Sequence, residues 1–133
     1  MRVLLDSNVL ISAFISNGVC SELLDHCIIT HTVVTSNYIL SEFSEKLITK
    51  FYYSPREVST ARKILEEQCE IVNPEPLRFA VSRDVKDDPI LAAALEGHCD
   101  CLITGDKDLL VLRTFQGIPI LKPSAFADWE ITR

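Results

Sequence analysis

Short apolar runs alternate with longer segments of helical periodicity along the whole sequence. Strands are expected at the apolar runs 2–5, 31–35, 70–72, 101–104 and 118–121. Helices are expected at residues 9–15, 21–27, 37–52, 55–69 and 90–97, with short helical turns at 106–110 and 123–129. Because helices separate successive strands, the pattern predicts an α/β fold with a central, mostly parallel sheet and helices on both faces. The strands are apolar throughout, as is typical of sheets that are buried on both sides.

Residues with strong positional preferences mark two helix starts. Ser36 is the predicted N-cap of the helix at 37–52. Asp88 is the predicted N-cap of the helix at 90–97. The segment 77–87, which precedes Asp88, is mostly polar and is expected to be a loop.

Length and composition are those of one globular domain. The 133 residues suit a single core, so we assign residues 1–133 to one domain. The hydrophobic fraction of 47% argues against a disordered chain. Asp6 and Asn8 interrupt the first apolar run, which is too short for a signal peptide, and no stretch approaches the roughly 18 apolar residues of a membrane span. The expectation is therefore a cytoplasmic protein with no membrane partner.

The five cysteines favour reduced thiols over disulfides or a zinc site. An odd number of cysteines without a secretion signal indicates free thiols. Cys99 and Cys101 lie beside His98, which suggests a metal cluster at first. They lack the two-residue gap of common zinc motifs, and no second Cys/His pair complements them. Buried free cysteines are therefore the preferred interpretation.

The net charge is unusual for a protein that binds nucleic acid. The formal charge is −6, whereas nucleic-acid binding depends on positive side chains that neutralise phosphates. The charge is unevenly distributed, because residues 46–86 hold eight Lys/Arg and six Asp/Glu while the remainder holds five and thirteen. A basic edge in the middle of the chain is compatible with this distribution, although an ordinary solvated surface explains it equally well.

Acidic residues follow strands or open helices at several distant points. Asp6 follows the first strand, Asp106 follows the strand at 101–104, and Glu42 lies in the helix after the second strand. Asp84, Asp87 and Asp88 precede or open the helix that leads into the strand at 101–104. Ligands of parallel α/β sheets bind beyond the C-terminal ends of the strands, so these acids could meet there. Clustered carboxylates suit Mg²⁺ or Mn²⁺, which can activate water and stabilise charge on a phosphodiester.

Each acid taken alone has a simpler explanation. Asp6 could be an ordinary turn residue, and Asp106 and Asp108 could be turn or N-cap residues. Helical periodicity places Glu42 away from the apolar stripe of its helix, which predicts a solvent-facing side chain. The functional interpretation therefore depends on the set of acids and not on any one of them.

Three motifs give the sequence a resemblance to a known family. They are LLDSNVLISA at 4–13, DDPILAAAL at 87–95 and LITGDKDLL at 102–110, and the segment Ser41-Glu42-Phe43 matches in position. In this order they resemble the acidic motifs of the PIN-domain family, and most closely its small prokaryotic members, which include VapC-type toxins. The resemblance covers essentially the whole chain.

The resemblance implies a Rossmann-like core and a Mg²⁺- or Mn²⁺-dependent ribonuclease. Carried over by position, the metal-binding and catalytic residues are Asp6, Glu42, Asp88 and Asp106. The motif leaves two adjacent acids open, and Asp88 is chosen over Asp87 because the Ala-rich helix begins directly after it. Residues expected to orient the ligands are Ser7, Asn8, Thr104, Asp87 and Asp108. The family further implies an RNA substrate, homodimer formation and, for toxin members, an antitoxin partner.

Two other functions stay open at this point. The first is a non-catalytic module that binds RNA or a protein partner and keeps the fold without the activity. The second is a phosphatase of the haloacid-dehalogenase type, which places an Asp nucleophile after its first strand. That class requires a second Asp two residues later, where this sequence has Asn8. The presence of all four candidate acids favours the nuclease.

Overall fold

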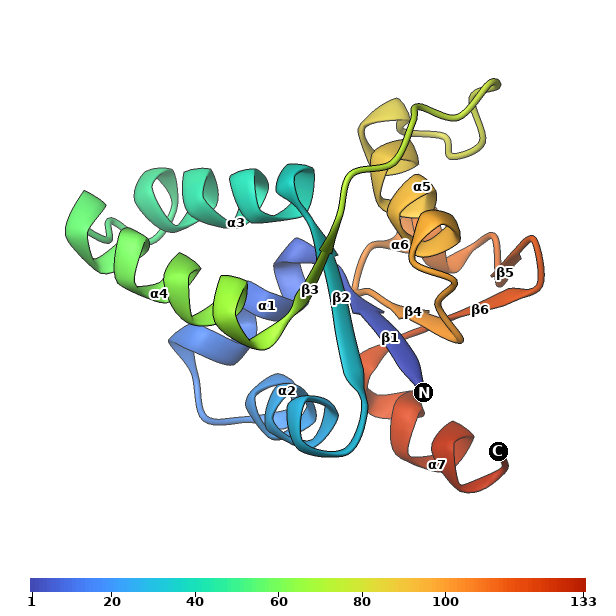
Figure 1. Ribbon diagram of the computed structural model, residues 1–133, viewed down its shortest axis with the longest axis horizontal. Coiled ribbons are helices and arrows are strands. Elements are labelled where there is room, and N and C mark those ends of the chain that lie inside the picture. Colours follow the sequence, from blue (N-terminus) through green and yellow to red (C-terminus); the bar gives the residue numbers. More distant parts are fainter.

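The computed structural model describes residues 1–133 as an α/β fold around a six-stranded sheet. The strands run in the order β3-β2-β1-β4-β6-β5. Their bounds are β1 Arg2–Leu5, β2 Thr32–Ser36, β3 Glu70–Val72, β4 Cys101–Ile103, β5 Thr114–Phe115 and β6 Ile118–Leu121. All neighbouring pairs are parallel except the edge pair of β5 and β6, which is antiparallel. Figure 1 shows the sheet with its helices labelled.

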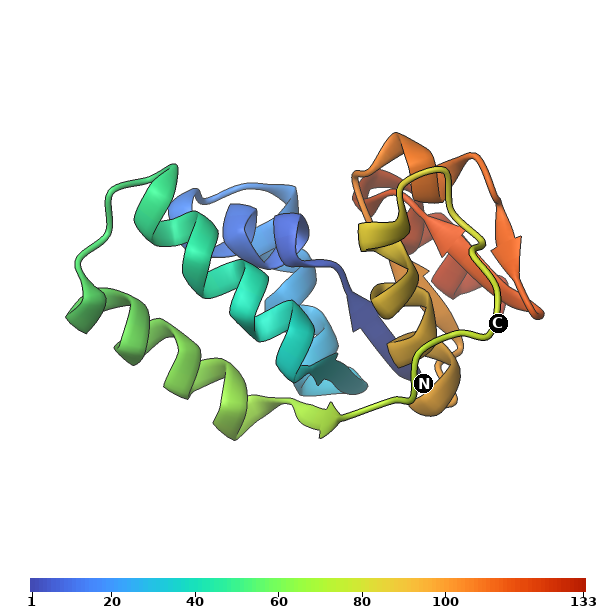
Figure 2. The same ribbon diagram turned by 90° about the horizontal axis from the view of Figure 1, so that it is seen from above.

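Helices cover both faces of the sheet, as the alternating pattern predicts. The α-helices are α1 Ser7–Ile15, α2 Val19–Thr30, α3 Asn37–Thr49, α4 Pro55–Gln68, α5 Asp88–Glu96, α6 Lys107–Leu110 and α7 Phe126–Ile131, and short 3₁₀ turns lie at η1 Val85–Asp87 and η2 Pro123–Ala125. Seen from above in Figure 2, α1, α3 and α4 lie on one side of β1 and α5 lies on the other. The predicted fold class is therefore confirmed.

The path of the chain through the sheet creates a crevice beside β1. From β1 the chain moves outward through β2 to β3, then returns across the sheet to place β4 on the other side of β1. The backbone N–H of Asp6 donates to the carbonyl oxygen of Ile103 at 2.9 Å, which holds the ends of β1 and β4 together. A reversal of strand order is where doubly wound sheets bind their ligands. The two strands that meet there are those followed by Asp6 and Asp106.

A single apolar core fixes these strand ends in place. One cluster of 31 buried residues spans the sheet and the helices on both faces. α5 packs closely on β2 at Gly97, where an added Cβ would lie 2.7 Å from Cγ1 of Val34. The close approach requires glycine and holds α5, with the acids at its start, against the sheet.

Local helix signals account for most of the helix starts. Ser36 caps α3 through a hydrogen bond from the Ile39 amide, as predicted. α1 begins two residues earlier than expected because the Asp6 side chain accepts from the Ser7 amide and caps it. α2 is longer than predicted and α3 ends at Thr49, three residues short of its predicted end. The two-residue strand β5 is absent from the prediction.

The structure also bears on the cysteines and on the length of the apolar helices. All five cysteines are free thiols, and Cys27, Cys99 and Cys101 are buried. No single helix has the length and apolar composition of a membrane span, and α1 and α2 reach that length only as a pair bent by 107°.

Candidate functional site

Asp6 is a buried carboxylate at the crevice between β1 and β4. Its side chain is almost fully enclosed, at 3% relative exposure. Oδ1 accepts a hydrogen bond from the Ser7 amide at 2.7 Å, and Oδ2 accepts one from the Thr104 hydroxyl at 2.7 Å. No salt bridge neutralises it. The structure therefore keeps a buried negative group in place with hydrogen bonds alone.

Thr104 links this carboxylate to the next acid. Its hydroxyl donates to Asp6 and accepts from the backbone N–H of Asp106 at 3.0 Å. Asp106 in turn caps the short helix α6, because its Oδ1 accepts from the Asp108 amide at 2.8 Å. The turn after β4 is thus fixed in a shape that brings Asp106 next to Asp6.

Glu42 joins the same cluster from α3. Ser7 donates from Oγ to Glu42 Oε1 at 3.2 Å, which connects α3 to the start of α1. The side chain is half-buried, so the prediction from periodicity alone, a solvent-facing Glu42, is wrong. Its position beside the buried Phe43 places it at the flank of the apolar stripe, where α1 packs against α3.

Asp87 is the acid of the 81–88 segment that faces the cluster. It is buried at 6% exposure and accepts from the Ser82 hydroxyl at 3.3 Å. Burial, and after it the adjacent negative charge of Asp106, raises its pKa from 3.8 to about 7. The carboxylate oxygens of Asp84, Asp87 and Asp108 also lie within 4.8 Å of one another.

Asp88 does not line the cavity that the other acids share. Its two carboxylate oxygens accept the amides of Val81 and Ser82, at 3.1 and 2.8 Å. It also makes no N-cap bond to α5, because it is the first residue inside that helix, and the N-cap position belongs to Asp87. The structure therefore turns Asp87 toward the other acids and Asp88 toward the loop, an arrangement that differs from the predicted choice of Asp88.

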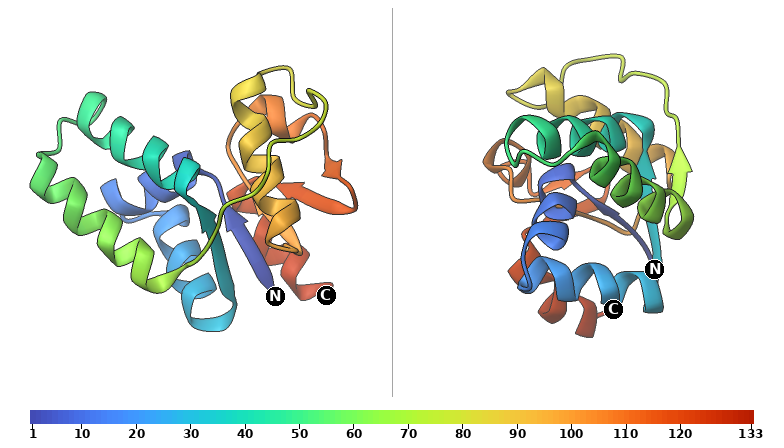
Figure 3. Two further views of the ribbon diagram at one scale, coloured as in Figure 1. Left: turned by 45° about the horizontal axis from the view of Figure 1, so that its top comes forward. Right: turned by 90° about the vertical axis from the view of Figure 1, so that its left-hand side faces the viewer.

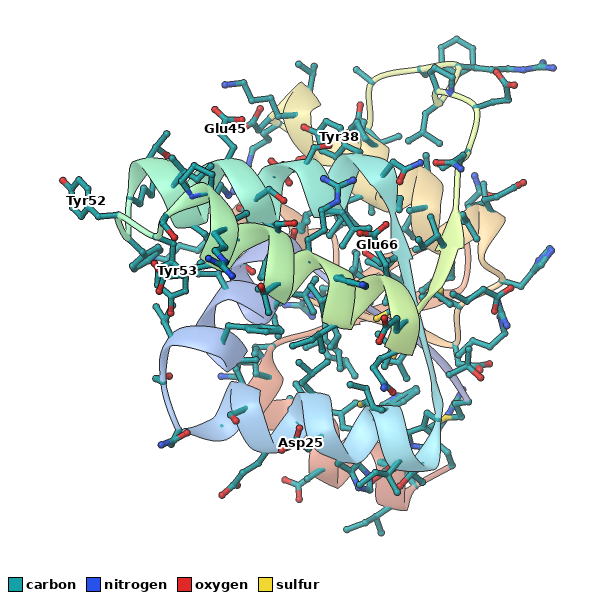
Figure 4. All side chains as sticks on the ribbon, turned by 60° about the vertical axis from the view of Figure 1, so that its left-hand side comes forward. Asp25, Tyr38, Glu45, Tyr52, Tyr53 and Glu66 are labelled. Carbon is teal, nitrogen blue, oxygen red and sulfur yellow. The ribbon has the colours of Figure 1, made fainter.

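The acids open into a polar cavity of about 590 Å³ between α3, η1 and the start of α6. The residues that line it are Tyr38, Ser41, Glu42, Glu45, Lys46, Thr49, Lys50, Asp84, Lys86, Asp87 and Asp106. Figure 4 shows Tyr38 and Glu45 on α3, on the side toward η1, with Asp25 on α2 far from them. Five acids reach this cavity from three separate segments of the chain, together with three lysines.

A comparison with protein-family models assigns the chain to a family. A model described as PIN domain matches residues 2–108 of the chain. The chain belongs to the PIN-domain family. No curated protein matches it in sequence.

Solved structures share the fold of this PIN domain at low sequence identity. VapBC2 from Rickettsia felis, bound to a DNA fragment from its promoter, matches with a TM-score of 0.67 and 14% identity over 92% of this chain and 98% of that one. PAE2754 from Pyrobaculum aerophilum matches with a TM-score of 0.65 and 16% identity, over 100% and 91%. VapC20 from Mycobacterium tuberculosis, a Sarcin-Ricin loop cleaving toxin, matches with a TM-score of 0.61 and 12% identity, over 88% and 98%.

The electrostatics of the PIN-domain cluster favour a bound cation. Burial raises the pKa of Asp6 and, together with the charge of Asp6, that of Glu42, although Lys46 acts in the opposite direction on both. Raised pKa values mean that the ionised carboxylates are less stable here than in water. Oxygen ligands that form no salt bridge suit a hard divalent ion such as Mg²⁺ or Mn²⁺. The residues present therefore fit the metal that the family implies.

The supporting residues expected from sequence divide into two groups. Ser7 and Thr104 hydrogen-bond to the acids directly, as expected. Asn8 is exposed and its side chain makes no hydrogen bond to the acids. Asp108 forms a 2.8 Å ion pair with Arg83 at the rim of the site.

Lys46 and Asp84 line the cavity but are not among the site residues predicted from the sequence. Lys46 follows Glu42 by four residues, so helical spacing alone would have placed both on one face of α3. Asp84 belongs to the acids expected near the sheet edge, but it lies in an irregular segment where no periodicity sets its direction. Its place beside Asp87 depends on the loop conformation that Asp88 holds.

Because Asp88 binds the loop and Asp87 faces the cavity, loss of the Asp88 side chain should affect stability and leave metal binding intact. Replacement of Asp88 by alanine should lower the free energy of unfolding by about 1–2 kcal/mol, because the amides of Val81 and Ser82 lose a charged acceptor. Addition of Mn²⁺ should still raise the melting temperature of the Asp88→Ala protein, as we expect for the wild type. Urea unfolding and thermal melts measure both, and a stable Asp88→Ala protein that no longer responds to Mn²⁺ would return Asp88 to the metal site.

Proposed function

We propose that this PIN domain is a Mg²⁺- or Mn²⁺-dependent endoribonuclease. The observation that carries the proposal is the cluster of Asp6, Glu42, Asp87 and Asp106 at the reversal of strand order. None of these four carboxylates forms a salt bridge within the chain. Mutual repulsion between them costs stability unless a cation offsets it.

Each residue of the cluster has a defined role in the proposal. Asp6, Asp87 and Asp106 hold the metal, directly or through water, and Glu42 either holds it or orients the attacking water. A bound divalent ion supplies charge stabilisation and lowers the pKa of water. The Thr104 hydroxyl keeps Asp6 oriented, and its single proton is already given to that carboxylate.

The lysines of the cavity supply what an acidic site lacks for binding RNA. Lys46 is half-buried beside Glu42, and Lys50 and Lys86 are exposed at the rim. A polyanionic strand needs positive side chains near the cleaved phosphate, since phosphate contacts dominate nucleic-acid affinity. The three lysines lie within the 46–86 segment, the basic part of the chain, and this placement supports an RNA substrate.

The direct test is metal-dependent cleavage. Incubation of the full chain with a structured RNA should give internal cleavage in Mg²⁺ or Mn²⁺ and none in excess EDTA, because the carboxylates alone cannot stabilise a more negative transition state. Gel analysis of end-labelled RNA measures it. Restoration by added Mn²⁺ separates metal removal from denaturation.

A different outcome would support the non-catalytic alternative. If the protein binds RNA in a gel-shift assay but cuts neither RNA nor DNA at any Mn²⁺ concentration, the nuclease proposal fails and a binding module stands in its place. The same measurement with Lys50→Ala tests the RNA contact, since loss of one phosphate contact weakens binding and its salt dependence.

We further propose that the chain acts as the toxin of a toxin–antitoxin pair. The support is its fold, shared with VapC20 and with VapBC2. Large apolar side chains at the outer end of α3 and α4 are exposed, including Phe51 at 41% and Tyr52 at 86%. Such a surface suits an antitoxin or a second copy of the chain. The mass of the isolated chain in solution tests whether it forms a homodimer.

A further inference from the structure

Two histidines and a glutamate converge at the edge of the sheet opposite the acids. His26 lies in α2, His31 caps its C-terminus, and Glu130 lies in α7. Nε2 of His26 is 2.8 Å from Oε2 of Glu130, and Nε2 of His31 contacts the same oxygen. The three ligand atoms all lie within 4.8 Å of one another. Figures 1 and 3 show α2 and α7 side by side where β1 begins, far from the start of α5.

The site is built into the fold on one side and open on the other. The side chain of His31 is only 8% exposed, whereas that of His26 is 45% exposed. Phe126 packs edge-on against both imidazoles, with ring centroids 6.5 Å from His26 and 6.1 Å from His31. A cavity of about 280 Å³ borders His26 and Glu130 and contains Glu22, one helical turn before His26. The rings are therefore held in orientation while one side stays accessible to solvent.

We propose that His26, His31 and Glu130 form a Zn²⁺ site that ties α7 to α2. Two imidazoles and one carboxylate are a common zinc ligand set, with the fourth position left to water. In a tetrahedral site with bonds of 2.0–2.2 Å, ligand atoms lie about 3.3 Å apart. The separation of Nε2 of His26 from Oε2 of Glu130 is shorter by roughly half an ångström, and His31 lies closer still to that oxygen, so the flexible Glu130 side chain must rotate away to admit the ion.

The other nitrogen of each ring also has a polar neighbour. Oγ1 of Thr30 lies 3.5 Å from Nδ1 of His26 and can accept its proton. The amino group of Met1 lies 3.0 Å from Nδ1 of His31. Partners of this kind fix the tautomer and orientation of imidazole ligands. Mg²⁺ prefers oxygen ligands, so the two sites of the chain select different ions.

The experiment is a Zn²⁺ titration of the full chain in excess Mg²⁺, which occupies the carboxylate cluster. Calorimetry should give one Zn²⁺ per chain. Co²⁺ as a spectroscopic substitute should give the visible bands of a tetrahedral site without a thiolate charge-transfer band, which excludes the cysteines. His26→Asn and Glu130→Gln should each weaken Zn²⁺ binding by at least about tenfold.

The third histidine of the chain provides a matched control. His98 is exposed, lies after α5 and takes a left-handed backbone conformation that asparagine tolerates. His98→Asn should bind Zn²⁺ like the wild type. Absence of Zn²⁺ binding, a thiolate band with Co²⁺, or undiminished binding by both His26→Asn and Glu130→Gln would each overturn the proposal and leave only an ion-paired cluster. RNA cleavage in Mg²⁺ is measured separately, so neither result depends on the other.

Discussion

Replacement of Asp6 by asparagine should reduce RNA cleavage by at least about a thousandfold without unfolding the protein. A metal ion contributes several kcal/mol to a phosphodiester transition state, and a loss of ~4 kcal/mol corresponds to about a thousandfold in rate. Asparagine keeps the shape and the acceptor oxygen that the Ser7 amide or the Thr104 hydroxyl requires. Single-turnover cleavage of end-labelled RNA at saturating Mn²⁺ measures the change.

The matched control for this variant is Asp25→Asn. Asp25 is an exposed aspartate on α2, on the far side of the molecule from the cavity (Figure 4). The Asp25→Asn variant loses the same charge as Asp6→Asn and should cleave RNA at the wild-type rate. A folded Asp6→Asn protein that retains full activity would show that Asp6 has no part in the reaction.

Removal of the Asp87 charge should stabilise the metal-free protein above neutral pH. The carboxyl has its pKa raised from 3.8 to about 7, first by burial and then by Asp106. A group that holds its proton more tightly when folded makes the folded state less stable as pH rises from about 4 to about 7. Asp87→Asn removes this loss, so its melting temperature in EDTA at pH 8 should exceed that of the wild type by about 3 °C or more.

The pH and metal dependence distinguish this effect from a general gain in packing. The difference in melting temperature should shrink toward pH 5, where the wild-type carboxyl is protonated. Mn²⁺ should raise the melting temperature of the wild type more than that of Asp87→Asn, because binding to the folded state stabilises it by mass action. Equal Mn²⁺ shifts in the two proteins would exclude Asp87 from the metal site.

The positions that sequence predicted best are those fixed by the main chain. Asp6 and Asp106 could be placed because each follows a strand, and parallel strands end at a common edge. The same reasoning gave the sheet and its flanking helices. Chain direction and hydrophobic pattern suffice for such positions, since neither requires knowledge of how side chains pack.

Side-chain direction is what the sequence left undetermined. Neighbouring residues in a helical turn point about 100° apart, so the choice between Asp87 and Asp88 depends on how η1 and α5 are rotated. That rotation is set by the amides of Val81 and Ser82, which bind Asp88 from a loop without periodicity. Glu42 presents a related difficulty, because periodicity orients it within α3 but does not reveal that α1 lies alongside.

The first strand of the chain lies at the centre of the sheet, between partners made much later. Thr104, which donates to Asp6, follows it by 98 residues. A growing polypeptide emerges from the ribosome N-terminus first, and contacts of such long sequence separation are the slowest to form. Asp6 is therefore synthesised 100 residues before Asp106 and cannot meet it until β4 and the turn after it have been translated. The strand order thus delays assembly of the four carboxylates until β4 has been made, and a chain that stops before β4 carries only part of them.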